Sequence, residues 1–300
     1  MSRSSPSSPS VTRAYIGALF AVAVWGASFI ATKVAVRQSD PSTVICLRFG
    51  IGIPVLFIAV ARRGEFTWPG WRAVLQFAAI GTLGITIHQW LQVTGLVTAQ
   101  ASTTAWIITA TPLTIALVGW VALGERLGSH QWAGIALGTA GVLLVVSRGN
   151  WASLAGGSFG SIGDLLVSIS TVTWAIFSVC SRKALQKHAA APMMLYVMAG
   201  GWFMSAVPWV LSGGLGHVAR LAPSGWTALV FLGVLCSGLA YVYWYDALRV
   251  LPTAKVGSLL YLEPLVTMAV AAAVLGEQIT AASIVGGVII LAGVRTATLR

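Results

Sequence analysis

The feature that most constrains this chain is a series of apolar runs, each about 20 residues long, that fills most of its 300 residues. About 20 consecutive apolar residues suffice for a helix to cross the hydrocarbon core of a bilayer. Each run must be helical, because an open strand would leave backbone groups unpaired in hydrocarbon. Ten runs are found, at residues 14–36, 41–60, 74–96, 99–121, 129–147, 163–184, 192–211, 226–247, 253–274 and 281–298.

Composition leads to the same fold class. Charged residues make up 8% of the chain and hydrophobic residues 57%, with a mean hydropathy of +0.86. A soluble domain carries roughly 25% charged residues, so most of this surface must face lipid rather than water. The sequence predicts an all-α polytopic membrane protein with ten transmembrane helices, and the lipid bilayer is its first partner.

Basic residues indicate the orientation. The net charge is +11, but the 18 Lys and Arg residues are scattered near the ends of the runs, which is typical of topology signals and not of nucleic-acid binding. Ten spans place both termini on one side, and a cytoplasmic N-terminus puts thirteen basic residues inside and four outside. The inner set is Arg3, Arg13, Arg62, Arg63, Arg72, Arg126, Arg182, Lys183, Lys187, Arg249, Lys255, Arg295 and Arg300; the outer set is Lys33, Arg37, Arg148 and Arg220. We expect a multi-pass protein of the plasma membrane with both termini in the cytoplasm.

The chain divides into two halves. Residues 1–13, which begin as a Ser/Pro-rich segment, are expected to form a disordered cytoplasmic N-terminus. The first half covers residues 14–148, a Gly/Ser-rich linker covers 149–162, and the second half covers 163–300. The first run is too long for the apolar region of a signal peptide, which has about 7–15 residues, so we expect it to be retained.

The two halves repeat each other. A shift of 152 residues places Pro112 on Pro264 and the Gly-Glu pair at 124–125 on that at 276–277. A shift of 149 residues places Trp25 on Trp174 in the first run of each half. Five runs per half is an odd number, so the second half would enter the membrane from the opposite side. Inverted repeats of this kind are typical of secondary transporters, because they give two similar gates around one central site.

These residues also carry a family resemblance. The clearest copy is the segment 247–294, with its Glu-Pro within a span, its Gly-Glu a dozen residues later and a last helix ending in Ala-Gly-Val. With Trp25-Gly26 and Lys33 of the first run, it resembles the EamA family of the drug/metabolite transporter superfamily over residues 14–298. The resemblance implies a ten-helix carrier that exports amino acids or related metabolites across the bacterial inner membrane, with a periplasmic linker. The aromatic central spans are most similar to aromatic amino acid exporters of the YddG type.

Polar and aromatic residues near the middle of the spans are the candidates for contact with a small-molecule substrate. Several share a helix face, such as His88 and Gln92 at i and i+4, and a polar face in lipid should turn inward. The candidate set is Trp25, Ser28, His88, Gln92, Trp106, Thr109, Trp174, Ser178, Tyr241, Trp244 and Tyr261. Plain packing remains open for the indole rings, and a helix–helix hydrogen bond for His88. Aromatic walls would suit ring-bearing or cationic cargo.

Glu263 is the most costly residue to place in a membrane, since it precedes Pro264 near the middle of a span. Three interpretations stay open: a structural partner, binding of a substrate ammonium group, or transfer of a coupling proton. Pro264 and Pro112 each remove a helical hydrogen bond, and we predict that both act as hinges.

Other charges have less demanding interpretations. Arg48 is expected either to extend to the outer headgroups or to form an ion pair within the bundle. Glu125 and Glu277 are expected to be solvated or to cap helices. Asp246, Arg249 and Lys255 are expected to form a local charge network, as part of an inner gate.

Other functional classes fit less well. The four histidines fall on four segments, and no phosphate-binding, zinc-binding or Ser-His-Asp pattern is present, so we expect neither an enzyme nor a cofactor. A channel or flippase remains as an alternative, although aromatic residues in the middle of the membrane would interrupt a pore. Export of other metabolites or of cationic drugs is a further alternative. The oligomeric state stays open, and a monomer is compatible with the sequence.

Overall fold

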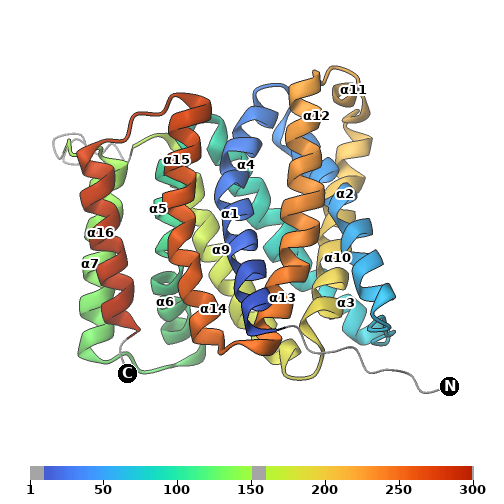
Figure 1. Ribbon diagram of the computed structural model, residues 1–300, viewed down its shortest axis with the longest axis horizontal. Helices are drawn as coiled ribbons and strands as arrows, with labels where there is room; N and C mark the ends of the chain where they lie inside the picture. Colours follow the sequence, from blue (N-terminus) through green and yellow to red (C-terminus); the bar gives the residue numbers. More distant parts are fainter. Residues whose placement is uncertain (1–9, 151–159, 299–300) are drawn as a thin grey trace.

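The computed structural model describes residues 10–150 and 160–298, and these residues form helices and no strand. The helices run side by side as one bundle (Figure 1). Their bounds are α1 Val11–Val36, α2 Pro41–Arg62, α3 Trp71–Gly81, η1 Thr82–Ile87, α4 His88–Thr98, α5 Ala101–Thr109, α6 Thr111–Leu123, α7 Ser129–Val146, α9 Ile162–Leu185, α10 Ala190–Leu211, α11 Leu215–Val218, α12 Pro223–Val230, η2 Phe231–Leu239, α13 Ala240–Val250, α14 Thr253–Leu259, η3 Leu260–Leu262, α15 Glu263–Leu275 and α16 Ala281–Ala297.

The all-helical membrane fold is confirmed at the level of candidate spans. Within the described residues, eight helical segments are long and apolar enough to cross a bilayer. The pair α5 and α6 makes a ninth if this pair, bent by 43°, counts as one span, and α16 is a shorter apolar helix. Each of the ten predicted runs coincides with a helical segment, but ten crossings remain a prediction.

The first helix begins earlier than predicted. It starts at Val11, where the Ser10 side chain accepts a hydrogen bond from the backbone N–H of Arg13 at 3.3 Å. The prediction of disorder up to residue 13 is therefore wrong for its last three residues, because a serine cap stabilises an earlier start. Residues 1–9 and most of the predicted linker, 151–159, lie outside the described residues.

Two wide helical turns were not predicted. The segments η1 and η2 are π-helical and interrupt otherwise continuous helices between α3 and α4 and between α12 and α13. They occupy matching places in the two halves, since residues 82–87 shifted by 152 become 234–239. Hydrophobic runs do not distinguish α from π geometry, and π turns often mark functional sites.

The two prolines predicted to act as hinges each start a helix rather than lie inside one. Pro112 is in the first turn of α6 and Pro264 in the first turn of α15, where a missing N–H is tolerated. The chain bends before Pro112, and before Pro264 it forms the short 3₁₀ segment η3. These breaks lie where hinges are predicted; movement at them stays a prediction.

Glycines allow two helices to approach closely at one side of the bundle, where α7 lies against α16 (Figure 1). A Cβ on Gly134 would lie 2.6 Å from the carbonyl oxygen of Gly293, and one on Gly141 would lie 2.7 Å from that of Gly286. Larger side chains at these positions would force the backbones apart. Close small-residue packing of this kind is a common way to join helices in lipid.

The bundle has two ends, which we name by the chain termini. The terminal end holds Val11, Thr298 and the connection 63–70, and it is the lower end in Figure 1. The far end holds the connections 37–40, 212–222 and 276–280. Both described ends of the chain thus lie together, as an even number of passes through the bundle requires.

Candidate functional site

One group of predicted residues meets where α1 packs against α13. The Trp25 ring centroid lies 5.4 Å from that of Tyr241 and 5.1 Å from that of Trp244. The indole N–H of Trp25 donates to the carbonyl of Cys236 at 3.2 Å, and the Ser28 hydroxyl donates to the carbonyl of Trp25 at 2.7 Å. We call Trp25, Ser28, Tyr241 and Trp244 the Trp25 group.

A second group forms between α4 and α9. His88 Nδ1 lies 2.8 Å from the carbonyl oxygen of Ser170; a carbonyl only accepts, so Nδ1 donates its proton there. The His88 ring lies 4.8 Å from that of Trp174, and the Ser178 hydroxyl donates to the carbonyl of Trp174 at 2.8 Å. His88 therefore makes the helix–helix hydrogen bond that was one of its two interpretations.

Gln92 lies one helical turn beyond His88 and is 8% exposed. Its amide has no hydrogen-bond partner among the described residues. Its contact with a substrate, predicted from the sequence, stays a prediction. We call His88, Gln92, Trp174 and Ser178 the His88 group.

The remaining predicted residues lie in a different place. Trp106 is 2% exposed, and its indole N–H contacts the sulfur of Met268 at 3.2 Å. Tyr261 packs against the same apolar cluster, which also includes α16 residues. The Thr109 hydroxyl donates within its own helix at 2.8 Å. The structure thus places Trp106 and Tyr261 at one apolar cluster, apart from the Trp25 and His88 groups.

Arg48 was not among the predicted site residues, yet it lies between the two groups. It is 7% exposed, so the prediction that it extends to the outer headgroups is wrong. Its Nε donates to Ser237 Oγ at 2.9 Å, Nη2 to Cys236 Sγ at 3.0 Å and Nη1 to Gln89 Oε1 at 3.4 Å. An arginine inside an apolar run was the available signal; its partners come from other helices, which the sequence does not place.

Glu263 begins α15 and is partly buried. Its carboxylate has no hydrogen-bond or ion-pair partner among the described residues, so the structural partner that was one of its interpretations is absent from this conformation. It lies within electrostatic range of Cys236 and Tyr241, as does Arg48. Ammonium binding and proton coupling remain predictions.

The far end is closed around Glu277. This carboxylate is 8% exposed and accepts hydrogen bonds from the backbone N–H groups of Ala101 and Ser102 at 2.8 and 3.0 Å, and from the Ser102 hydroxyl at 2.7 Å. It therefore caps α5, as predicted for a helix-capping role. Lys33 lies 4.0 Å from it and donates to the carbonyl of Ala99.

The matching residue at the terminal end has a different environment. Glu125 is 49% exposed, and its carboxylate pairs with Arg182 Nη1 at 3.1 Å. Arg182 is itself 66% exposed. The shift of 152 relates Glu125 to Glu277, and the shift of 149 relates Lys33 to Arg182. Matching glutamate and basic residues therefore lie near each other at both ends, buried at the far end and exposed at the terminal end.

The charge network predicted around Asp246, Arg249 and Lys255 is arranged differently from the expectation. Arg63 donates two hydrogen bonds to Asp246 at 2.6 and 2.8 Å, and Arg249 donates two to Glu65 at 2.6 and 2.8 Å. Each pair joins the connection after α2 to α13. Lys255 is exposed and has no ion pair among the described residues. The hydrogen bonds from Arg249 lower the pKa of Glu65 below its ordinary value, despite an opposing effect of burial.

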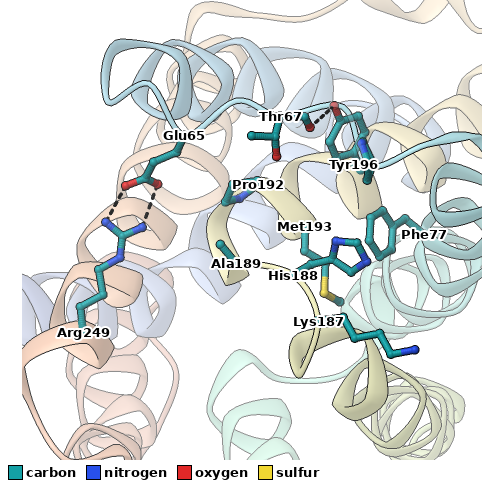
Figure 2. Close-up of a pocket in the computed structure, with 11 residues that line it drawn as sticks. Glu65, Thr67, Phe77, Lys187, His188, Ala189, Pro192, Met193, Tyr196 and Arg249 are labelled. Carbon is teal, nitrogen blue, oxygen red and sulfur yellow. Dashed lines mark hydrogen bonds and ion pairs between the residues drawn. The ribbon is translucent and has the colours of Figure 1, made fainter.

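A cleft opens beside this network. It has a volume of about 320 Å³, and Figure 2 shows the Glu65–Arg249 pair on one side with Phe77, His188 and Tyr196 on the other. The Tyr196 hydroxyl donates to the carbonyl of Thr67 at 3.0 Å. None of the predicted substrate-contact residues lines the cleft, which lies at the terminal end of the bundle.

Comparison with known proteins identifies the same pattern twice along the chain. The model of the EamA-like transporter family matches residues 12–147 and again residues 161–299. An uncharacterized transporter of Archaeoglobus fulgidus is 29% identical, with 92% of this chain and 94% of that one aligned. A probable amino-acid metabolite efflux pump of Salmonella typhimurium is 28% identical over 92% of this chain and 91% of its own.

A solved crystal structure shares the fold. It superposes with a TM-score of 0.64 at 22% identity, over 95% of this chain and 98% of the other. The family and the names of these relatives indicate a multi-pass membrane transporter.

Proposed function

The chain belongs to the EamA-like transporter family, and from that premise we propose that it exports an amino acid or related small metabolite across the bacterial inner membrane. Transport would occur by alternating access, with one gate at each end of the bundle. The name of the Salmonella relative supports an amino-acid metabolite as cargo. The Trp25 and His88 groups supply ring faces, which favours aromatic or hydrophobic side chains.

Two inverted halves would give the two gates. Reciprocal contacts support this arrangement: Gly134 lies against Gly293 and Gly141 against Gly286, and a shift of 152 exchanges the members of these two pairs. Such an exchange is what a pseudo-two-fold axis between α7 and α16 would produce.

A second set of contacts agrees with this symmetry. Gly81 approaches Gly201, and Gly52 approaches Gly233, where a Cβ on Gly52 would lie 3.0 Å from the carbonyl oxygen of Gly233. Shifts of 152 and 149 convert the first pair into the second. Helices of one half therefore pack against helices of the other in matching ways, which supports ten crossings in two interlocked halves.

The orientation is proposed from charge. Both described termini lie at one end of the bundle (Figure 1), and placing that end in the cytoplasm puts thirteen basic residues inside and four outside. The cleft of Figure 2 then opens to the cytoplasm.

The observation that best supports alternating access is the different burial of the glutamates in the two Gly-Glu motifs. Glu277 is buried against the start of α5 at the far end, whereas Glu125 is 49% exposed at the terminal end. We interpret this conformation as closed to the outside and released at the cytoplasmic end. In the opposite conformation Glu125 would become buried against the start of α14 and Glu277 would be released.

A second candidate cargo is an organic cation, such as a cationic drug. The partly buried Glu263 carboxylate, which has no partner among the described residues, favours it. A channel or flippase is less well supported, because the Glu277 contacts and the aromatic groups obstruct a continuous path.

Reconstitution into proteoliposomes tests the proposal. Saturable uptake of a labelled amino acid that is accelerated by the same unlabelled amino acid on the other side is expected of a carrier. Ion currents, or no exchange for any of the twenty amino acids and for ethidium, would contradict it. A pH jump applied to the wild type and to Glu263→Gln tests coupling: a proton gradient should drive only the wild type.

A further inference from the structure

Arg48 is a cation held inside the bundle by neutral groups. Its acceptors are the hydroxyl of Ser237, the sulfur of Cys236 and the side-chain carbonyl of Gln89. A buried cation is costly unless an anion compensates it, so this guanidinium is incomplete without a negative partner.

The acidic side chains, all of them in the described part of the chain, supply no such partner. All seven acidic residues lie in the described part of the chain, and none forms an ion pair with Arg48. Six are occupied elsewhere: Asp40 with Thr43 and His217, Glu65 with Arg249, Glu125 with Arg182, Asp164 with Ser161, Asp246 with Arg63, and Glu277 with Ala101 and Ser102. The seventh, Glu263, has no partner among the described residues.

The guanidinium retains donors for an added anion. It carries five N–H groups, and the three observed bonds use one each on Nε, Nη1 and Nη2. One N–H therefore remains on each terminal nitrogen. Two N–H donors match the two oxygens of a carboxylate, which arginine binds more strongly than neutral acceptors.

The position of Arg48 is also suitable for cargo. Cys236, which contacts Arg48 through its sulfur, accepts the indole N–H of Trp25 through its carbonyl. Gln89, on the other side, directly follows His88. A carboxylate at Arg48 would thus place the rest of a small molecule between the Trp25 group and the His88 group.

We propose that Arg48 binds the carboxylate of the transported molecule, so that the cargo is an amino acid or related carboxylic acid and not a simple organic cation. This inference rests on the proposed transport function and narrows its substrate class. The position related to Arg48 by the shift of 149 is Val197, so the second half lacks a guanidinium at the matching position, and a cargo bound at Arg48 would have a defined orientation.

Matched pairs of probes test the inference without any mutation. Proteoliposomes containing the full chain are given phenylalanine and phenethylamine, leucine and 3-methylbutylamine, and cysteine and cysteamine, which differ within each pair by the carboxylate. We expect at least tenfold faster uptake of the amino acid in each transported pair. Equal or faster uptake of the amines would overturn the role of Arg48 while leaving a transport function in place.

Variants then assign the discrimination to Arg48. Arg48→Met should abolish the tenfold preference, because it keeps the buried volume but removes the donors, and Arg48→Lys should restore part of it. Arg220→Met, which removes an exposed cation at the far end, is the matched control and should behave as the wild type. Persistence of the preference in Arg48→Met would overturn the proposal.

The remaining outcomes are also decisive. If the wild type transports none of the six probes, the comparison is extended to the remaining amino acids and their decarboxylated amines, and transport of no member of any pair overturns both the proposed function and the inference. If Arg48→Met does not fold, the wild type and Arg48→Lys still test the inference. A carboxylate site at Arg48 requires that the wild type prefer the amino acids, and it predicts weaker amino-acid uptake by Arg48→Lys.

Discussion

The two ends of the bundle contain the same local motif in two different environments. Gly124 and Gly276 both end a helix with φ of 67° and nearly equal ψ, and each is followed by a glutamate. Glu277 nevertheless accepts three hydrogen bonds from α5 and is 8% exposed, while Glu125 pairs with Arg182 and is 49% exposed. The local backbone is therefore the same, and the difference arises from how the neighbouring helix is placed.

This difference shows which end of the bundle is held by stronger contacts in this conformation. Two backbone N–H groups at the start of α5 depend on a carboxylate from the other half of the chain. Unsatisfied groups of this kind cost about 1–3 kcal/mol each, whereas an exposed ion pair contributes roughly 0–1 kcal/mol. The contacts at the far end should therefore stabilise this conformation, and the contacts at the terminal end should be broken at a lower cost in free energy.

The largest effect is expected from Glu277→Ala. It removes the cap of α5 and should weaken the closed far end by about 3 kcal/mol, which is on the order of a 100-fold shift in the conformational equilibrium. Labelling of Ala105→Cys by a membrane-impermeant maleimide from the far side should rise accordingly, in a chain whose native cysteines are replaced. Unchanged labelling would show that Glu277 does not close this end.

The pair Lys33 and Arg182 gives the next test. Lys33→Met removes a side chain that is 13% exposed and donates to the carbonyl of Ala99, and it should lower stability by about 1–2 kcal/mol. Arg182→Met changes a side chain that is 66% exposed and should have an effect of less than about 0.5 kcal/mol. Thermal unfolding in detergent should show the larger decrease in Tm for Lys33→Met; equal decreases would contradict the comparison.

Acid should weaken the terminal end through Glu65. Its folded-state pKa is lowered by the hydrogen bonds from Arg249, so its stabilising contribution is present above the ordinary pKa, near 4.5, and is lost as the pH falls through the folded value. Since both side chains are partly exposed, that contribution is about 1 kcal/mol or less.

Glu65→Gln should therefore be less stable than the wild type at pH 7, and this difference in stability should shrink as the pH falls below the ordinary pKa of Glu65. Melting curves across this range provide the measurement. A difference that grows as the pH falls would have the wrong sign for this pair.

The smallest effect on stability is expected from Glu125→Gln. Its carboxylate is 49% exposed, so the described conformation should lose less than about 0.5 kcal/mol. Transport should fall sharply all the same if, as proposed, Glu125 caps α14 in the opposite conformation. Normal transport in this variant would show that the two ends do not exchange roles.

Much of the architecture could be read from the residues. Apolar runs locate the long helical segments, since hydrocarbon accepts only backbone that is hydrogen-bonded internally, but not the short helix α11. The sequence repeat aligned the two Gly-Glu motifs, and their local conformations agree: Gly124 and Gly276 end their helices with nearly the same φ and ψ. The contacts of Trp25 with Tyr241 and Trp244 also bring together three residues that the sequence predicts as substrate contacts.

Other features depend on contacts between helices, which no single run encodes. The placement of Trp106 against α16 and the choice between a buried Glu277 and an exposed Glu125 are of this kind. Arg48 is the clearest case: its sequence context shows a charge in an apolar helix, while its neutral partners come from two other helices. The sequence determined which segments are apolar enough to run through the bundle, because the hydropathy of a segment is a local property. Only the tertiary structure decided which charges remain without a partner, because pairing depends on which helices lie side by side.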